Sequence, residues 1–167
     1  MRPSERLGVP FLLAVLAAVV TACGSGAPAR TLPISPGTAA APREVNIIAR
    51  EYRFDPPNVD VVPGETVLLH VIDAGLEIHE VVIGDAGVQA AWEAAEAATV
   101  SAPPGPTPHV SVPPGSEGLR VVVRSGERVD VEWTVPTSTD PLIVGCHIPG
   151  HWAKGMQVPV RFVAPGG

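Results

Sequence analysis

The stretch Cys146-His147-Ile148-Pro149-Gly150-His151-Trp152-Ala153-Lys154-Gly155-Met156 places a thiol, an imidazole and a thioether at C-x4-H-x4-M spacing. Soft sulfur ligands combined with imidazole select copper, and one cysteine, two histidines and a weak axial methionine describe a blue-copper electron-transfer site. The stretch supplies three of these four ligands, so we expect the fourth to be a histidine on a distant strand. His79, which begins the apolar run 79–83, fits that role.

The counts of sulfur side chains make this pattern specific. The chain has two cysteines and two methionines, of which Cys23 ends an export segment and Met1 is the initiator. Cys146 and Met156 are therefore the sulfur side chains that remain, and they lie ten residues apart in one predicted loop. The alternative is a buried free cysteine with a gap-filling methionine. The proline and glycines between the two residues instead favour a tight loop around an ion.

This arrangement resembles the cupredoxin family, the small blue copper proteins that include azurin, auracyanin and plastocyanin. The resemblance rests on Cys146, His151 and Met156 and on His79 opening a valine-rich strand, and it covers roughly residues 44–164. It implies a Greek-key β-sandwich, one type 1 copper ion and one-electron transfer between protein partners, hence a carrier and not an enzyme. It also implies that His79, Cys146 and His151 are equatorial ligands, with His151 nearest the surface, and that Met156 is axial.

Other residues near these ligands depart from known patterns. Glu80 follows the first histidine, where many cupredoxins have an asparagine that ties the two ligand loops together. His147 stands where multicopper oxidases have a histidine of a second copper centre, but Gly145 replaces the preceding histidine and the chain has no His-x-His pair. We therefore expect no second copper cluster. We expect His70 to be a strand residue with a local hydrogen bond and His109 to be an exposed loop residue.

The N-terminal region has the pattern of an export signal. Two arginines precede the apolar stretch 9–20, and Cys23 follows small residues as in a bacterial lipobox. We predict a signal peptide over 1–22 and lipidation of Cys23, which anchors the protein to the outer face of the bacterial cytoplasmic membrane. Ordinary signal cleavage, with Cys23 incidental, is the alternative. A lone thiol at Cys146 in an oxidising compartment also needs protection, which copper ligation provides.

The rest of the chain predicts a tether followed by one all-β domain. Residues 23–43 are rich in Ala, Gly and Pro and read as a flexible tether. The copper-binding domain spans 44–167, with an insertion at about 84–118 that contains a helix over 88–98 and then an irregular loop. Short apolar or alternating segments separated by turn residues predict a β-sandwich. The predicted strands are 45–54, 58–62, 66–72, 79–83, 119–124, 128–135, 142–144 and 157–163.

Charge limits the partners. The net charge is −6, and without residues 1–22 it becomes −7, from nine basic and sixteen acidic side chains. The sequence has no basic cluster, so we expect no nucleic-acid partner. An acidic surface favours steering toward a basic redox partner. We expect a monomer that exchanges electrons with a redox donor and a redox acceptor, while the lipid binds the membrane.

Two other functions stay open. A copper storage or delivery protein would hold a metal that is easily lost, although the chain has no Met-rich or multiple-Cys tract. An electron-transfer subunit of a larger redox enzyme is the second possibility. The sequence offers no second metal site with an open position, and it offers no nucleophile triad or carboxylate pair that could be placed, so an enzyme acting alone is disfavoured.

Overall fold

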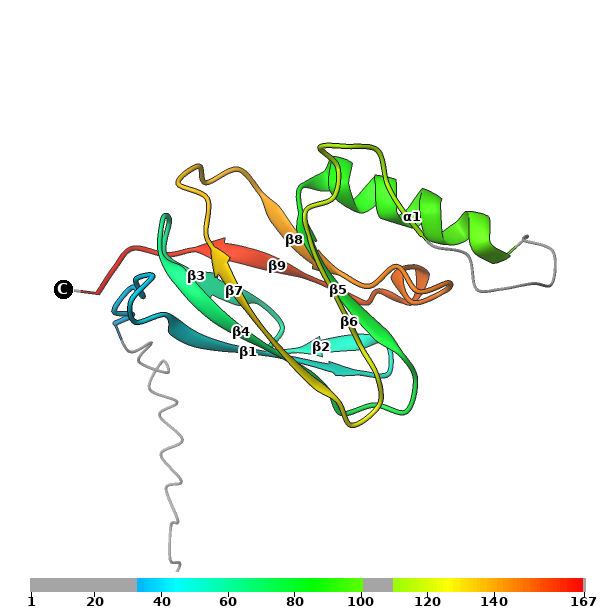
Figure 1. The fold of residues 1–167 in the computed structure, drawn as a ribbon, viewed down its shortest axis with the longest axis horizontal. Helices are drawn as coiled ribbons and strands as arrows, with labels where there is room; N and C mark the ends of the chain where they lie inside the picture. Colours follow the sequence, from blue (N-terminus) through cyan, green and yellow to red (C-terminus); the bar gives the residue numbers. More distant parts are fainter. Residues whose placement is uncertain (1–32, 101–109, 167) are drawn as a thin grey trace, which may run out of the picture. The chain divides into compact units, whose positions relative to one another are not determined.

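The computed structural model describes residues 33–100 and 110–166 of the chain. The predicted signal peptide 1–22, Cys23 and His109 lie outside the described residues. The described part forms two β-sheets with one helix between the fifth and sixth strands, which confirms the predicted β-sandwich with a helical insertion (Figure 1). None of the described helices is long and apolar enough to span a membrane.

The two sheets have four and five strands. The first has the order β2-β1-β4-β7 and consists of β1 (Arg43–Arg50), β2 (Arg53–Asp55), β4 (Thr66–Asp73) and β7 (Arg128–Thr134). The second has the order β3-β9-β8-β5-β6 and consists of β3 (Val59–Val61), β5 (His79–Gly84), β6 (Leu119–Val123), β8 (Leu142–Gly145) and β9 (Gln157–Phe162). The chain passes from one sheet to the other after β2, β3, β4, β6 and β7, as in Greek-key sandwiches.

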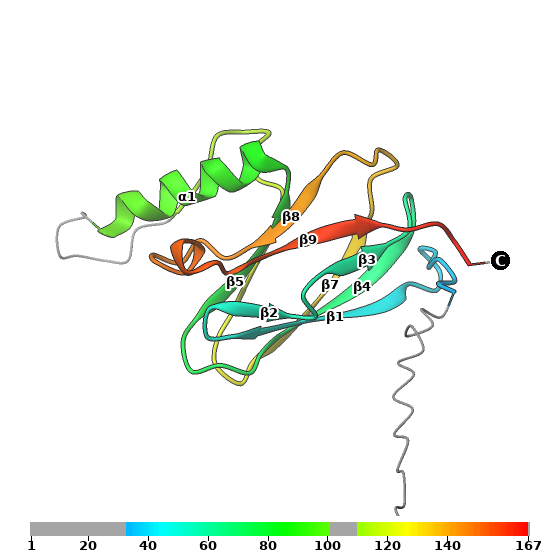
Figure 2. The same ribbon diagram turned by 180° about the vertical axis from the view of Figure 1, so that it is seen from behind.

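The core lies between the sheets and follows from alternation along the strands. In β4, Val67, Leu69 and Val71 are fully buried and point inward with Ile47 of β1. In β5 all six residues are buried, so this strand is covered on both faces. The second cover is the helix α1 (Ala86–Val100), which contacts β5 and β8 and lies beside them in both views (Figures 1 and 2).

The insertion between β5 and β6 is anchored to the domain. Asp85 caps α1 by accepting a hydrogen bond from the Val88 amide at 2.9 Å. Trp92 is buried, and its indole nitrogen donates to the Glu117 carbonyl at 2.9 Å. The predicted helix 88–98 lies within α1, and Trp92 holds the helix against the segment that precedes β6.

The predicted strand over 45–54 is wrong, because two strands occupy this stretch. β1 ends at Arg50, and the chain turns so that β2 pairs with it antiparallel, Arg50 opposite Arg53. The stretch contains no glycine or proline that would have marked the turn. The turn matters for the site because it carries Tyr52.

Part of the segment predicted as tether is docked on the sandwich. The Ile34 carbonyl accepts from the Gly166 amide at 2.9 Å, and the Gly37 carbonyl accepts from the Thr66 amide at 3.1 Å. Arg43 already belongs to β1. These contacts use backbone groups, which leave no hydrophobic pattern in the sequence, so composition alone suggested a free chain. Residues 23–32 lie outside the described residues.

Candidate metal centre

Three of the predicted ligands meet at one edge of the five-stranded sheet. One ligand atom from each of His79, Cys146 and His151 lies within 4.8 Å of the other two. The register explains the meeting: β5 and β8 are antiparallel neighbours, with Val82 opposite Gly145. The start of β5, which is His79, and the residue after β8, which is Cys146, therefore reach the same edge.

The loop between β8 and β9 folds back and brings His151 and Met156 to this edge. The Cys146 amide donates to the Met156 carbonyl at 3.1 Å, and the Met156 amide donates to the His151 carbonyl at 3.2 Å. Gly150 and Gly155 have φ angles of +89° and +86°, which residues with a side chain rarely adopt. Met156 is fully buried in the same core. Its role as axial ligand remains a prediction.

The environment of Cys146 disfavours a free thiolate. Burial raises the pKa of the thiol to about 12, although backbone N–H groups of Glu80 and Ile148 act in the opposite direction. The Glu80 amide lies 3.5 Å from the sulfur atom. A coordinated cation removes the thiol proton outright, so a metal ion would complete a pocket that stabilises negative charge poorly without one.

Burial also prepares His79 for a metal. Desolvation lowers the pKa of its imidazole, against the attraction of Asp73, and so favours the neutral ring that metals bind. His79 is fully buried, and neither ring nitrogen has a hydrogen-bond partner among the described residues. Ring nitrogens of His79 that have no hydrogen-bond partner and lie near a thiol and a second imidazole fit a copper site.

His151 is the least buried of the four predicted ligands, at 3% exposure, but neighbouring side chains cover it. Its Nδ1 lies 3.4 Å from the Cys146 sulfur, and its Nε2 lies 3.0 Å from Glu77 Oε2. Tyr52 packs edge-on against the imidazole, with ring centroids 5.2 Å apart, and Lys154 lies over the Tyr52 ring. Sequence reasoning missed Tyr52 and Glu77, because nothing in the sequence places the two loops that carry them beside His151.

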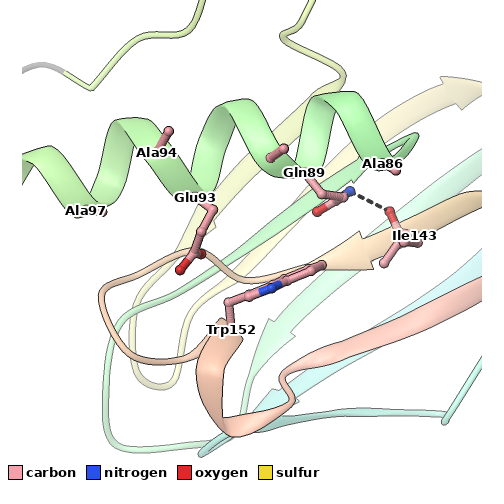
Figure 3. A pocket seen from close by; sticks show the side chains of 8 residues that line it. Ala86, Gln89, Glu93, Ala94, Ala97, Ile143 and Trp152 are labelled. Carbon is pink, nitrogen blue, oxygen red and sulfur yellow. Dashed lines mark hydrogen bonds between the residues drawn. The ribbon is translucent and has the colours of Figure 1, made fainter.

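His147 is outside the cluster and belongs to the contact with α1. The side-chain nitrogen of Gln89 donates to backbone carbonyls that include Ile143 at 2.9 Å (Figure 3), so its oxygen accepts from His147 Nε2 at 2.7 Å. His147 Nδ1 lies 2.9 Å from Glu93 Oε2. The ring stacks on Trp152, with centroids 4.7 Å apart. Side chains of helix α1 thus give a partner to both ring nitrogens of His147.

A groove of about 460 Å³ lies between α1 and the ligand loop. Trp152 forms one of its walls, opposite alanines of the helix (Figure 3). One face of this indole stacks on His147, so Trp152 separates the groove from the residue next to Cys146. The residues that line the groove are Ala86, Gln89, Ala90, Glu93, Ala94, Ala97, Ile143 and Trp152.

Glu80 ties the ligand-bearing segments together. It is fully buried, and its Oε1 accepts from the His147 amide at 3.0 Å. Its Oε2 accepts from Arg120 of β6 at 2.6 Å, and Arg120 also donates to Glu96 of α1 at 3.0 Å. Glu80 therefore links β5 to the Cys146 loop, the task that the resemblance gives to asparagine, and it also connects the site to the helix.

Comparisons with known proteins give the fold. No family model and no curated protein matches the chain. Among solved structures, reduced auracyanin from Roseiflexus castenholzii superposes with a TM-score of 0.55 at 18% identity, over 72% of this chain and 97% of its own. Auracyanin A, a blue copper protein from Chloroflexus aurantiacus, superposes with a TM-score of 0.55 at 22% identity, over 74% of this chain and 100% of its own. An azurin from Methylomonas sp. strain J superposes with a TM-score of 0.54 at 15% identity, over 74% of this chain and 100% of its own. The chain has the cupredoxin fold.

Proposed function

We propose that this protein is a type 1 copper protein that carries single electrons between redox partners and does not catalyse a reaction on its own. The observation that carries the proposal is the buried meeting of His79, Cys146 and His151, with their ligand atoms within 4.8 Å of one another. A thiolate with two imidazoles is the donor set of blue-copper sites. The cupredoxin fold agrees with this assignment.

In the proposed site, His79, Cys146, His151 and Met156 would hold one copper ion. The ion would supply a one-electron couple. The protein supplies a fixed frame for the ligands. His79 begins strand β5 and Cys146 directly follows the neighbouring strand β8, and backbone hydrogen bonds hold the loop from Cys146 to Met156. A frame that is rigid in both oxidation states keeps the rearrangement that accompanies each electron transfer small.

We also propose the setting of this electron transfer. Lipidation of Cys23 would hold the protein at the outer face of the bacterial cytoplasmic membrane, and a donor and an acceptor would dock there in turn. The negative charge of the chain favours basic partners. The domain would act as a monomer.

Copper loading with an absorption spectrum tests the proposal, and the two cysteines provide matched variants. The copper-loaded wild type and Cys23→Ser should show the intense visible band of a thiolate–copper bond and should bleach reversibly on reduction. Cys146→Ser should lose the band. A wild type that binds copper weakly and without colour would favour storage or delivery instead, and colour in Cys146→Ser would exclude the proposed ligand.

A further inference from the structure

Asp73 and His79 both have buried side-chain polar atoms without a hydrogen-bond partner. Among the described residues, the buried side-chain nitrogen and oxygen atoms without a hydrogen bond are Asp73 Oδ2 and the two ring nitrogens of His79. Both side chains are fully buried, and His79 Nε2 lies 3.9 Å from Asp73 Oδ1. Buried polar groups almost always have partners. This concentration of exceptions therefore points to an arrangement that is completed when a ligand binds.

We infer that Asp73 is a positioning residue for the metal centre, which accepts the Nε2 proton of His79 when copper binds at Nδ1. The inference rests on the proposed function. A metal at one imidazole nitrogen leaves the proton on the other, and a carboxylate there fixes the tautomer and the orientation of the ring. Because Nε2 faces Asp73, Nδ1 is the nitrogen left for the metal. This assignment gives a partner to both ring nitrogens and to the carboxylate.

The backbone around Asp73 holds the carboxylate in place. The Asp73 amide donates to the Glu127 carbonyl at 2.9 Å, and its carbonyl accepts from the Gly126 amide at 3.0 Å. Oδ1 accepts from the Gly75 amide at 2.8 Å. A Cβ atom at Gly75 would lie 3.0 Å from His79 Nε2 and 3.3 Å from Asp73 Oδ1, so glycine leaves the space in which these two groups face each other.

The second predicted histidine ligand is built in a similar way. His151 directs Nδ1 toward Cys146 and holds Nε2 at 3.0 Å from the Glu77 carboxylate. The two carboxylates differ in burial, since the Glu77 side chain is 56% exposed and the Asp73 side chain is fully buried. Solvent screens an exposed charge more strongly than a buried one. Asp73 should therefore influence the centre more than Glu77 does.

The chemical consequence has a definite sign. A carboxylate behind an imidazole makes the ring a stronger donor. Its negative charge favours Cu(II), which carries one more positive charge than Cu(I). Asp73 should therefore strengthen Cu(II) binding and hold the reduction potential low. Removing its charge should weaken Cu(II) binding and raise the potential.

The test measures Cu(II) affinity by chelator competition, together with the reduction potential, in three variants. Asp73→Asn keeps an oxygen for the Gly75 amide but removes the charge, and it should weaken Cu(II) binding about 10–100-fold and raise the potential. Glu77→Gln should shift both quantities in the same direction by less. Asp140→Asn, which removes an exposed loop charge, is the control and should change neither.

A measurement on the wild type decides the case if Asp73→Asn does not fold. In ¹⁵N NMR spectra of the Cu(I)-loaded protein, His79 should carry its proton on Nε2, and this proton should exchange slowly with water. A proton on Nδ1, or a folded Asp73→Asn with unchanged affinity and potential, would overturn the inference while the blue wild type left the proposed function standing. A wild type that does not bind copper would overturn both.

Discussion

Glu80 shows how one residue can hold a candidate metal-binding loop and an inserted helix together. Its two oxygens accept from different elements, the His147 amide of the ligand loop and the Arg120 guanidinium of β6. An asparagine offers a single, neutral side-chain oxygen, so it would not form the ion pair with Arg120. The substitution that departs from the family pattern is therefore matched by a basic residue placed to pair with it.

Glu80→Gln should destabilise the protein by about 2–3 kcal/mol, because a buried Arg–carboxylate pair loses its charge and one of the two donors loses its acceptor. We place this value below the one for a fully buried ion pair because Arg120 keeps its ion pair with Glu96, and because the Arg120 side chain is 26% exposed. Chemical denaturation of the metal-free protein measures the change. Glu132→Gln on the exposed face of β7 is the matched control and should change stability by less than about 0.5 kcal/mol. Equal effects in the two variants would contradict this role of Glu80.

At the scale of elements, α1 is a brace between β5, β8 and the ligand loop. Gln89 is 2% exposed and donates to the carbonyls of Val82, Gly84 and Ile143 while it accepts from His147. Gly145 permits this approach, since a Cβ atom there would collide with the side-chain oxygen of Gln89 and would lie 2.7 Å from the Trp152 ring. The absence of a side chain at Gly145, which the sequence offered only as evidence against a second copper cluster, thus makes room for the helix.

Gln89→Ala should cost about 1–3 kcal/mol of unfolding free energy, since a buried carbonyl and a buried imidazole nitrogen lose their partners. The better helix propensity of alanine offsets only a few tenths of a kcal/mol of this. Gln157→Ala provides the control, because Gln157 is the other glutamine of the chain and is exposed on β9. Denaturation curves of both variants measure the difference, and a Gln89→Ala curve that overlaid the wild type would show that α1 does not brace the sheet.

The helices and strands that the sequence could predict are those whose sequence patterns are local. Apolar runs such as 79–83 and the alanine-rich helix carry their own periodicity and propensity, so they were predicted close to where they occur. The ligand spacing is local too. The turn at Tyr52 and the contacts of Glu77 and Asp73 with the histidines depend on loops that meet only in the folded chain. No pattern in one sequence encodes such meetings.

At the scale of the whole domain, the two ends of the described domain lie opposite the candidate metal centre. The Ile34 carbonyl pairs with the Gly166 amide, so the beginning and the end of the described domain adjoin. Figures 1 and 2 show this end of the sandwich far from the loop between β8 and β9 that carries Cys146.

Because the proposed anchor is Cys23 and the proposed thiolate ligand is Cys146, we expect that the two cysteines can be disabled independently. Cys23→Ser should move the protein from the membrane fraction to the soluble exported fraction, because no lipid is attached, and its visible absorption per mole of protein should be unchanged. Cys146→Ser should stay in the membrane fraction and be colourless, because the centre lacks its thiolate. Fractionation of cells followed by spectra of detergent extracts measures both properties. Retention of Cys23→Ser in the membrane would rule out lipidation as the anchor, and loss of its colour would mean that the N-terminal region supports the metal centre.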